Sequence, residues 1–136
     1  MFQKSVRLRT YPRGFHLITH EIEHSLKECP IRNGIVHLFI KHTSASLSIN
    51  ENADPSVRAD MEAFFSENCD AKSYFIHTDE GEDDMPAHLK SALLGVSVTV
   101  PLTEGRLNLG TWQGIYLGEH REHASGREIV VTVMGE

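Results

Sequence analysis

Apolar and polar residues alternate at the start of the chain. Residues 2–11, with the sequence FQKSVRLRTY, place Phe2, Val6 and Leu8 on one side of a two-residue period and polar residues on the other. One apolar face and one polar face are typical of a half-buried strand. The pattern therefore predicts a strand here.

Residues 34–42, GIVHLFIKH, are almost continuously apolar or β-branched and predict a central strand. Because the connections near the C-terminus are short turns, the strands there should be antiparallel neighbours. Further strands are predicted at residues 15–19, 46–50, 73–77, 96–102, 107–119 and 127–135.

Three segments have helical spacing. The first should be capped by Thr19, continue the apolar face of Ile18 through Ile22 and Leu26, and end near Cys29. The second should start with Asp54 as N-cap and Pro55 in the first turn, and the third should end at Gly95. The residues predicted to form the apolar stripes are Val57, Met61, Phe64 and Phe65 in the second helix, and Met85, Leu89, Ala92 and Leu93 in the third.

This order of elements predicts an α+β fold with a largely antiparallel β-sheet or sandwich and about three helices. Because the chain has no linker, repeat or low-complexity tract, we expect residues 1–136 to form a single domain. Contacts between subunits are expected to complete part of the sheet.

Composition narrows the class of function. No apolar run reaches the about 18 residues that cross a bilayer, and the charged start does not resemble a signal peptide, so we expect a cytoplasmic protein without membrane contact. The two cysteines are too few for a disulfide framework, which agrees with a reducing compartment. A net charge of -6 argues against nucleic-acid binding but allows a small phosphorylated ligand.

Three of the nine histidines, His42, His77 and His88, are predicted to lie at the ends of elements, where sites are often built. Asp84 precedes His88 by four residues and can face it across one helical turn, which is how carboxylates orient metal-binding imidazoles. Three imidazoles with open positions would suit Zn²⁺ or a similar divalent ion. The alternative is that the three histidines are independent polar caps.

Residues 79–84, DEGEDD, contain five carboxylates. They fit either a solvated turn whose last members favour the start of the next helix, or a site for Mg²⁺, which prefers carboxylate and phosphate oxygens.

Several other polar residues could contact a ligand. Thr111 and Gln113 are expected on one face of a strand, bracketed by Gly110 and Gly114, where a ligand can approach closely. Ser91 would keep the neighbourhood of His88 small. If phosphate is bound, the available donors are the helix starts at Asp54 and Asp84, Ser44 or Ser46, and an arginine such as Arg106 or Arg121.

Three stretches together resemble the YjbQ-like family, also called the secondary thiamine-phosphate synthase family. They are HTSASLSINENADPSVRADME from residue 42, GEDDMPAHLKSALLG from residue 81 and GRLNLGTWQGIYLGEHR from residue 105, and the likeness runs over essentially the whole chain.

The resemblance implies a compact cytoplasmic homotrimer with a weak thiamine-phosphate synthase activity, a transferase reaction that joins a pyrimidine pyrophosphate to a thiazole phosphate. It also implies a histidine site at His42, His77 and His88. It adds Asn50, Glu51, Asp84, Ser91, Thr111 and Gln113 as pocket residues, with Glu51 as the candidate acid or base and with Gln113 and Ser44 positioning a substrate.

Two other functions stay open. One is a metal-assisted hydrolase or lyase acting on a small phosphorylated molecule, because three histidines suit a softer ion than the Mg²⁺ usual in pyrophosphate release. The other is a trimeric module that binds an anion or a metal without turnover.

Overall fold

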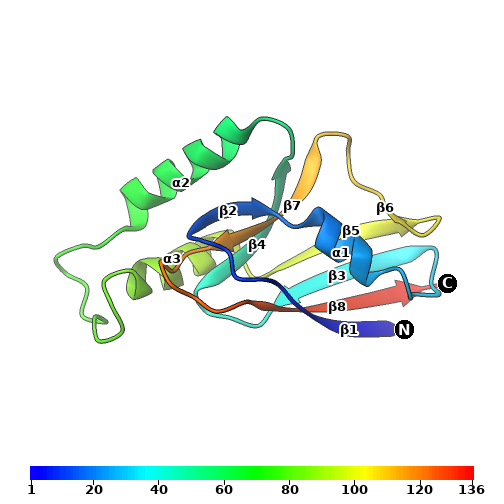
Figure 1. The fold of residues 1–136 in the computed structure, drawn as a ribbon, viewed down its shortest axis with the longest axis horizontal. Helices are drawn as coiled ribbons and strands as arrows, with labels where there is room; N and C mark the ends of the chain where they lie inside the picture. Colours follow the sequence, from blue (N-terminus) through cyan, green and yellow to red (C-terminus); the bar gives the residue numbers. More distant parts are fainter.

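The computed structural model describes residues 1–136, in which eight strands form two antiparallel sheets accompanied by three helices (Figure 1). The larger sheet has the order β1 (Phe2–Arg7), β8 (Glu128–Gly135), β3 (Gly34–Ile40), β5 (Ser97–Thr103) and β6 (Arg106–Leu107). The smaller sheet has the order β2 (Gly14–Leu17), β7 (Gln113–Glu119) and β4 (Ala45–Glu51). The α+β class with antiparallel sheets is confirmed.

β3 is the middle strand of the larger sheet, as its apolar sequence predicts. Val36, Leu38 and Ile40 point inward and are almost completely buried, whereas Ile35 and Phe39 on the other face are 47% and 43% exposed. The inward residues join one core cluster that includes residues of both sheets and of helix α1 (Thr19–Ser25). The outer face of the larger sheet has no layer of this chain covering it.

The helix ends agree with the sequence in two places. Helix α2 (Pro55–Cys69) starts behind Asp54, whose Oδ1 accepts a hydrogen bond from the Ser56 N–H at 2.9 Å. Helix α3 (Asp84–Leu94) ends at Gly95, which has a φ of 100°, a conformation that glycine adopts at little cost.

The prediction for the first helix is wrong in detail. Thr19 is not a cap, because its Oγ1 accepts a hydrogen bond from the Ile115 N–H of β7 at 2.9 Å. The helix also ends at Ser25, before the predicted end near Cys29.

Two predicted strands are also corrected. Residues 73–77 form no strand, and Tyr74 and Ile76 are 75% and 96% exposed, because no neighbouring strand is available to pair with them. Within residues 107–119, Thr111 lies in a turn and β7 starts only at Gln113, so the two residues do not share a strand face.

The predicted apolar stripe of α2 is confirmed in part: Val57, Met61 and Phe65 are half-buried, whereas Phe64 is 58% exposed. The predicted stripe of α3 does not form its buried face, because Ala92 and Leu93 are exposed. Helix α3 packs on β4, and its buried residues are Asp84, Pro86, Ala87, Lys90 and Ser91. The buried side of α3 therefore contains three polar side chains, and it carries the site described next. None of the three helices is both long enough and apolar enough to cross a membrane.

Candidate metal centre

Two histidines and one aspartate come together at the start of α3. Asp84 Oδ2 lies 2.7 Å from His77 Nε2 and 3.1 Å from His88 Nε2. The three ligand atoms all lie within 4.8 Å of one another. His88 reaches Asp84 across one helical turn, as the four-residue spacing predicts, whereas His77 arrives from the irregular segment before the helix. Two imidazole nitrogens and one carboxylate oxygen are a ligand set that Zn²⁺ and similar ions accept.

The second nitrogen of His88 fixes the tautomer of its ring. Nδ1 lies 2.8 Å from the carbonyl oxygen of Thr43, to which only a protonated Nδ1 can donate. A neutral His88 ring therefore presents the lone pair of Nε2 to the carboxylate of Asp84. Two acceptors at this distance require a proton or a cation between them. Metal-binding histidines commonly donate their other ring N–H to a carbonyl oxygen in this way.

Asp84 is only 1% exposed and is held by Arg121. The guanidinium group donates to Asp84 Oδ1 at 2.6 Å, to Asp83 Oδ2 at 2.9 Å and to the Glu80 carbonyl oxygen at 2.8 Å. Burial acts to raise the pKa of Asp84, but the hydrogen bond with His77 and the charges of His88 and Arg121 outweigh it and lower this pKa. Asp84 is therefore a carboxylate at neutral pH, with Oδ1 bonded to Arg121 and Oδ2 facing the histidines.

The other carboxylates of residues 79–84 do not gather around a common point. Asp83 is bonded to Arg121, while Asp79, Glu80 and Glu82 are exposed. The chain thus has one cluster that could hold a metal ion, and it contains a single carboxylate. Arg121, considered above as a phosphate donor, is occupied by this acidic segment.

His42 lies beside the cluster but outside it. Its Nε2 accepts a hydrogen bond from the Glu128 N–H at 2.8 Å. Burial, with the nearby Arg127 charge, lowers the pKa of His42, so the ring is neutral at pH 7. His42 and His88 both line a hollow of about 490 Å³, together with Ser91. A ligand in this hollow could touch both rings, but the role of His42 as a metal ligand stays a prediction.

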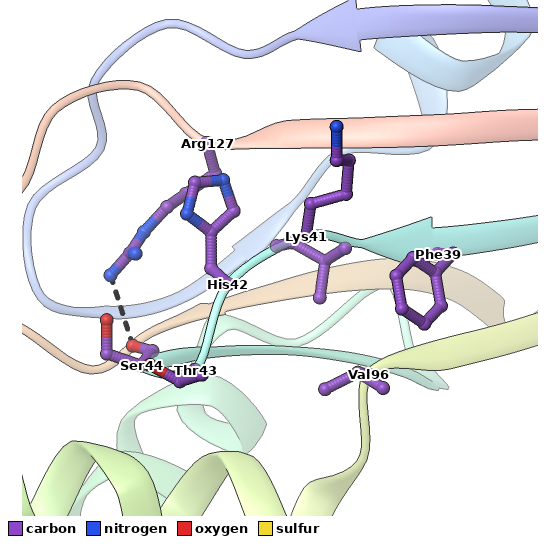
Figure 2. Close-up of a pocket in the computed structure, with 8 residues that line it drawn as sticks. Phe39, Lys41, His42, Thr43, Ser44, Val96 and Arg127 are labelled. Carbon is purple, nitrogen blue, oxygen red and sulfur yellow. Dashed lines mark hydrogen bonds between the residues drawn. The ribbon is translucent and has the colours of Figure 1, made fainter.

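A second hollow, of about 520 Å³, adjoins the first and also includes His42 in its lining (Figure 2). Ser44 lies here and is 9% exposed, and its carbonyl oxygen accepts a hydrogen bond from Arg127 at 3.1 Å. Arg127 also forms a buried ion pair with Glu119. Ser44 and Ser91 are therefore both close to the histidines, as their predicted role in binding a ligand requires.

Four predicted pocket residues lie elsewhere. Asn50 and Glu51 occupy the far end of β4, where Glu51 pairs with Gln113. Six residue steps of about 3.3 Å separate Glu51 from Ala45, which places it roughly 20 Å along the strand from the histidine end. Thr111 is in the turn just before Gln113. Within one chain, the structure does not bring these residues to the cluster.

Local hydrogen bonds occupy the polar groups at that far end. Gln113 Oε1 accepts from the Gly110 N–H at 2.8 Å, and Glu51 Oε2 accepts from the Asp54 N–H at 3.1 Å. Asn50 Oδ1 accepts from the Glu51 N–H at 2.8 Å. These contacts shape the turns at either side of the strand ends.

Comparison with known proteins identifies the family of this chain. A family model described as UPF0047 protein YjbQ-like matches residues 4–136. The chain belongs to this family. It is 52% identical over 136 residues to the UPF0047 protein YjbQ of Salmonella typhimurium and 50% identical over 136 residues to that of Escherichia coli O157:H7, and each alignment covers 99% of both chains.

Solved structures agree with this family assignment. A hypothetical protein from Aeropyrum pernix K1 superposes with a TM-score of 0.89 at 28% identity over 100% of both chains. A YbjQ-like protein of unknown function from Sulfolobus solfataricus P2 gives 0.88 at 29% identity, over 99% of this chain and 97% of that one. The YjbQ-like fold is therefore shared along the whole length of the chain.

Sequence reasoning missed two contributions to the site of this UPF0047 chain. The Thr43 carbonyl oxygen orients the His88 ring. Every residue has a backbone carbonyl, so the type of residue at position 43 does not indicate this contact. Arg121 forms an ion pair with Asp84. The only signals for this pair in the sequence were an arginine in one polar turn and several carboxylates in another. Both contacts join segments that are far apart along the chain.

Proposed function

We propose that this chain is a metal-dependent enzyme that acts on a small phosphorylated molecule, with a divalent transition-metal ion bound by His77, Asp84 and His88. The observation that carries the proposal is the convergence of two imidazole nitrogens on one buried carboxylate oxygen. The hydrogen bond from His88 Nδ1 to Thr43 supports it, because it turns a lone pair toward the ion.

The donor set favours Zn²⁺ or a similar ion over Mg²⁺, which prefers oxygen ligands. The side chains of His77 and His88 are 47% and 30% exposed, so a bound ion would keep coordination positions open to solvent or substrate, as catalytic sites do. When bound, such an ion supplies Lewis acidity that can polarise a phosphoryl oxygen or lower the pKa of a water molecule.

The chain's own residues prepare this position. Arg121 fixes Asp84 so that only Oδ2 faces the histidines, and Thr43 fixes the His88 ring. Ser91 and His42 line the adjoining hollow, where a substrate would lie against the open side of the ion. Positioning of this kind reduces the entropy that must be lost when the reacting groups meet.

The specific reaction implied by the family resemblance is thiamine-phosphate synthesis. Its test is formation of thiamine phosphate from the pyrimidine pyrophosphate and the thiazole phosphate, combined with complementation of a thiamine auxotroph. Absence of product at high enzyme concentration would favour the second enzyme candidate, a metal-assisted hydrolase or lyase. Turnover of neither substrate class would favour the binding module that performs no chemistry.

We extend the proposal to a cytoplasmic homotrimer. The support is an apolar area on the outer face of the larger sheet. Ile35 of β3 pairs there with Met134 of β8, and Phe39 lies further along β3. The side chains of all three residues are about half exposed. Exposed apolar areas of this kind are typical of protein interfaces. Light scattering should give three times the chain mass, and Phe39→Lys should reduce it; an unchanged monomer mass in both proteins would refute the assembly.

The predicted catalytic roles of Glu51 and Gln113 depend on that assembly. Because the two residues lie at the far end of β4 from the histidines of their own chain, only a neighbouring copy could bring them to a cluster. Glu51→Gln should therefore lower turnover without changing the metal content.

The metal itself is tested by elemental analysis of the purified chain and of three variants, His77→Ala, Asp84→Asn and His88→Ala. We expect about one ion per chain in the wild type and a large loss in each variant. His20→Ala, at a fully exposed position, is the matched control and should keep its metal. Stoichiometric metal in all the variants, or none in the wild type, would overturn the proposed centre.

A further inference from the structure

The connection between β3 and β4 has an unusual number of free hydrogen-bond donors. The backbone N–H groups of His42, Thr43 and Ser44 make no hydrogen bond within the chain, and neither do the hydroxyl groups of Thr43 and Ser44. Ser44 is nine-tenths buried as a whole residue, and it lines the second hollow. Buried backbone N–H groups are nearly always paired in folded proteins, with the protein, ordered water or a ligand.

His42 adds another donor. Because its Nε2 accepts the Glu128 N–H, the proton of the neutral ring is on Nδ1. No group of the chain accepts this proton. The ring therefore offers an N–H donor, which suits an oxygen anion.

Two of the three carbonyl groups of the same segment are already bonded. Thr43 accepts from His88 and Ser44 accepts from Arg127, which is drawn as a dashed line in Figure 2. In a trans peptide the N–H points opposite to the carbonyl group, so the Ser44 N–H points away from His88. The contact of His88 with the Thr43 carbonyl oxygen thus fixes the direction of the free Ser44 N–H.

The charges around the hollow favour an anion. Eight residues line it, including Lys41 and Arg127 but no aspartate or glutamate, although the chain as a whole carries a net charge of -6. Both cations are paired with carboxylates that do not line the hollow, Glu128 for Lys41 and Glu119 for Arg127. The lining itself therefore presents donors and positive groups but no carboxylate.

We infer that the segment His42–Ser44 and the hollow beside it bind a phosphate group of the substrate. This phosphate anchors the substrate and is separate from the substrate atoms that react at the metal. The inference rests on the proposed function, because it identifies the phosphate-binding part of that same site. The two hollows share His42, Thr43 and Val96, so one molecule can occupy both. Binding energy from a part of the substrate that does not react can then position the part that does.

The test uses the full-length, ¹⁵N-labelled chain stripped of metal and titrated with inorganic phosphate, while the backbone amide signals are followed by NMR. We expect saturable shifts at His42, Thr43 and Ser44. Ser44→Ala, which removes a hydroxyl donor to a charged group, should weaken binding by about tenfold. Ser5→Ala, on the exposed face of β1, is the matched control and should bind like the wild type.

The same titration of Asp84→Asn separates this inference from the metal proposal. Saturable shifts that persist in this variant support phosphate binding independent of the metal, even if no metal is found in the wild type. Shifts that do not saturate at these three amides, or that appear only near Asp84 and only after metal is added, would overturn the inference.

Discussion

Arg121 offers the sharpest test of the site's electrostatics. Arg121→Met keeps a side chain of similar length but removes the guanidinium group that bonds Asp84, Asp83 and the Glu80 carbonyl oxygen. The buried carboxylate of Asp84 would then have no permanent cation beside it. A divalent ion bound between His77 and His88 would restore the missing positive charge.

The size of the effect follows from burial. Breaking a buried ion pair by removing one partner costs about 3–5 kcal/mol. The Arg121 side chain is 22% exposed and water partly screens it, so we expect the free energy of unfolding to fall by about 2–3 kcal/mol in EDTA. With saturating Zn²⁺ the loss should be smaller, because a ligand that binds only the folded state stabilises it.

Urea denaturation at one fixed protein concentration, with and without Zn²⁺, measures both numbers. Arg106→Met, at an exposed arginine that forms no ion pair, is the matched control and should change the free energy of unfolding by less than about 0.5 kcal/mol. An equal loss for Arg121→Met with and without metal would refute the electrostatic link between Arg121 and the metal position.

Two further predictions concern the buried histidine beside β7. Burial and the charges of Lys90 and Arg127 lower the pKa of His120 to about 3, so the folded chain does not take up this proton while the unfolded chain does. Stability should therefore fall as the pH decreases from about 6.5 toward 3, and thermal unfolding of His120→Gln should show a smaller fall over that range. Gly118→Ala would place a Cβ 2.7 Å from the His120 ring and against Ser46 Oγ, so we expect a loss of about 2 kcal/mol in chemical denaturation; a wild-type midpoint would contradict this.

Local signals in the sequence predicted local structure well. Asp54 followed by Pro55 starts a helix because a side-chain acceptor and a fixed φ act within one turn, and Gly95 ends a helix for the same kind of local reason. The contact between Asp84 and His88 was predictable because four residues make one helical turn.

Contacts between distant segments were not predictable in the same way. Helical spacing says which residues share a face but not which face is buried, and in α3 the buried face contains Asp84, Lys90 and Ser91 instead of the predicted apolar stripe. Residues 73–77 have the composition of a strand but no strand beside them. Glu51 lies far from His42, although the two residues are close in sequence, because the extended strand β4 separates them.

The polar contact of α3 with the body of the protein has a mechanical consequence. Apolar contacts constrain direction less, because the hydrophobic effect is non-directional. The hydrogen bonds from His88 to Thr43, from Arg121 to Asp84 and from the fully buried Lys90 to Asp70 are directional, and each loses its partner if the helix shifts by one turn. Helix α3 can therefore dock in only one register, so the position of its histidine is set as soon as the helix is seated.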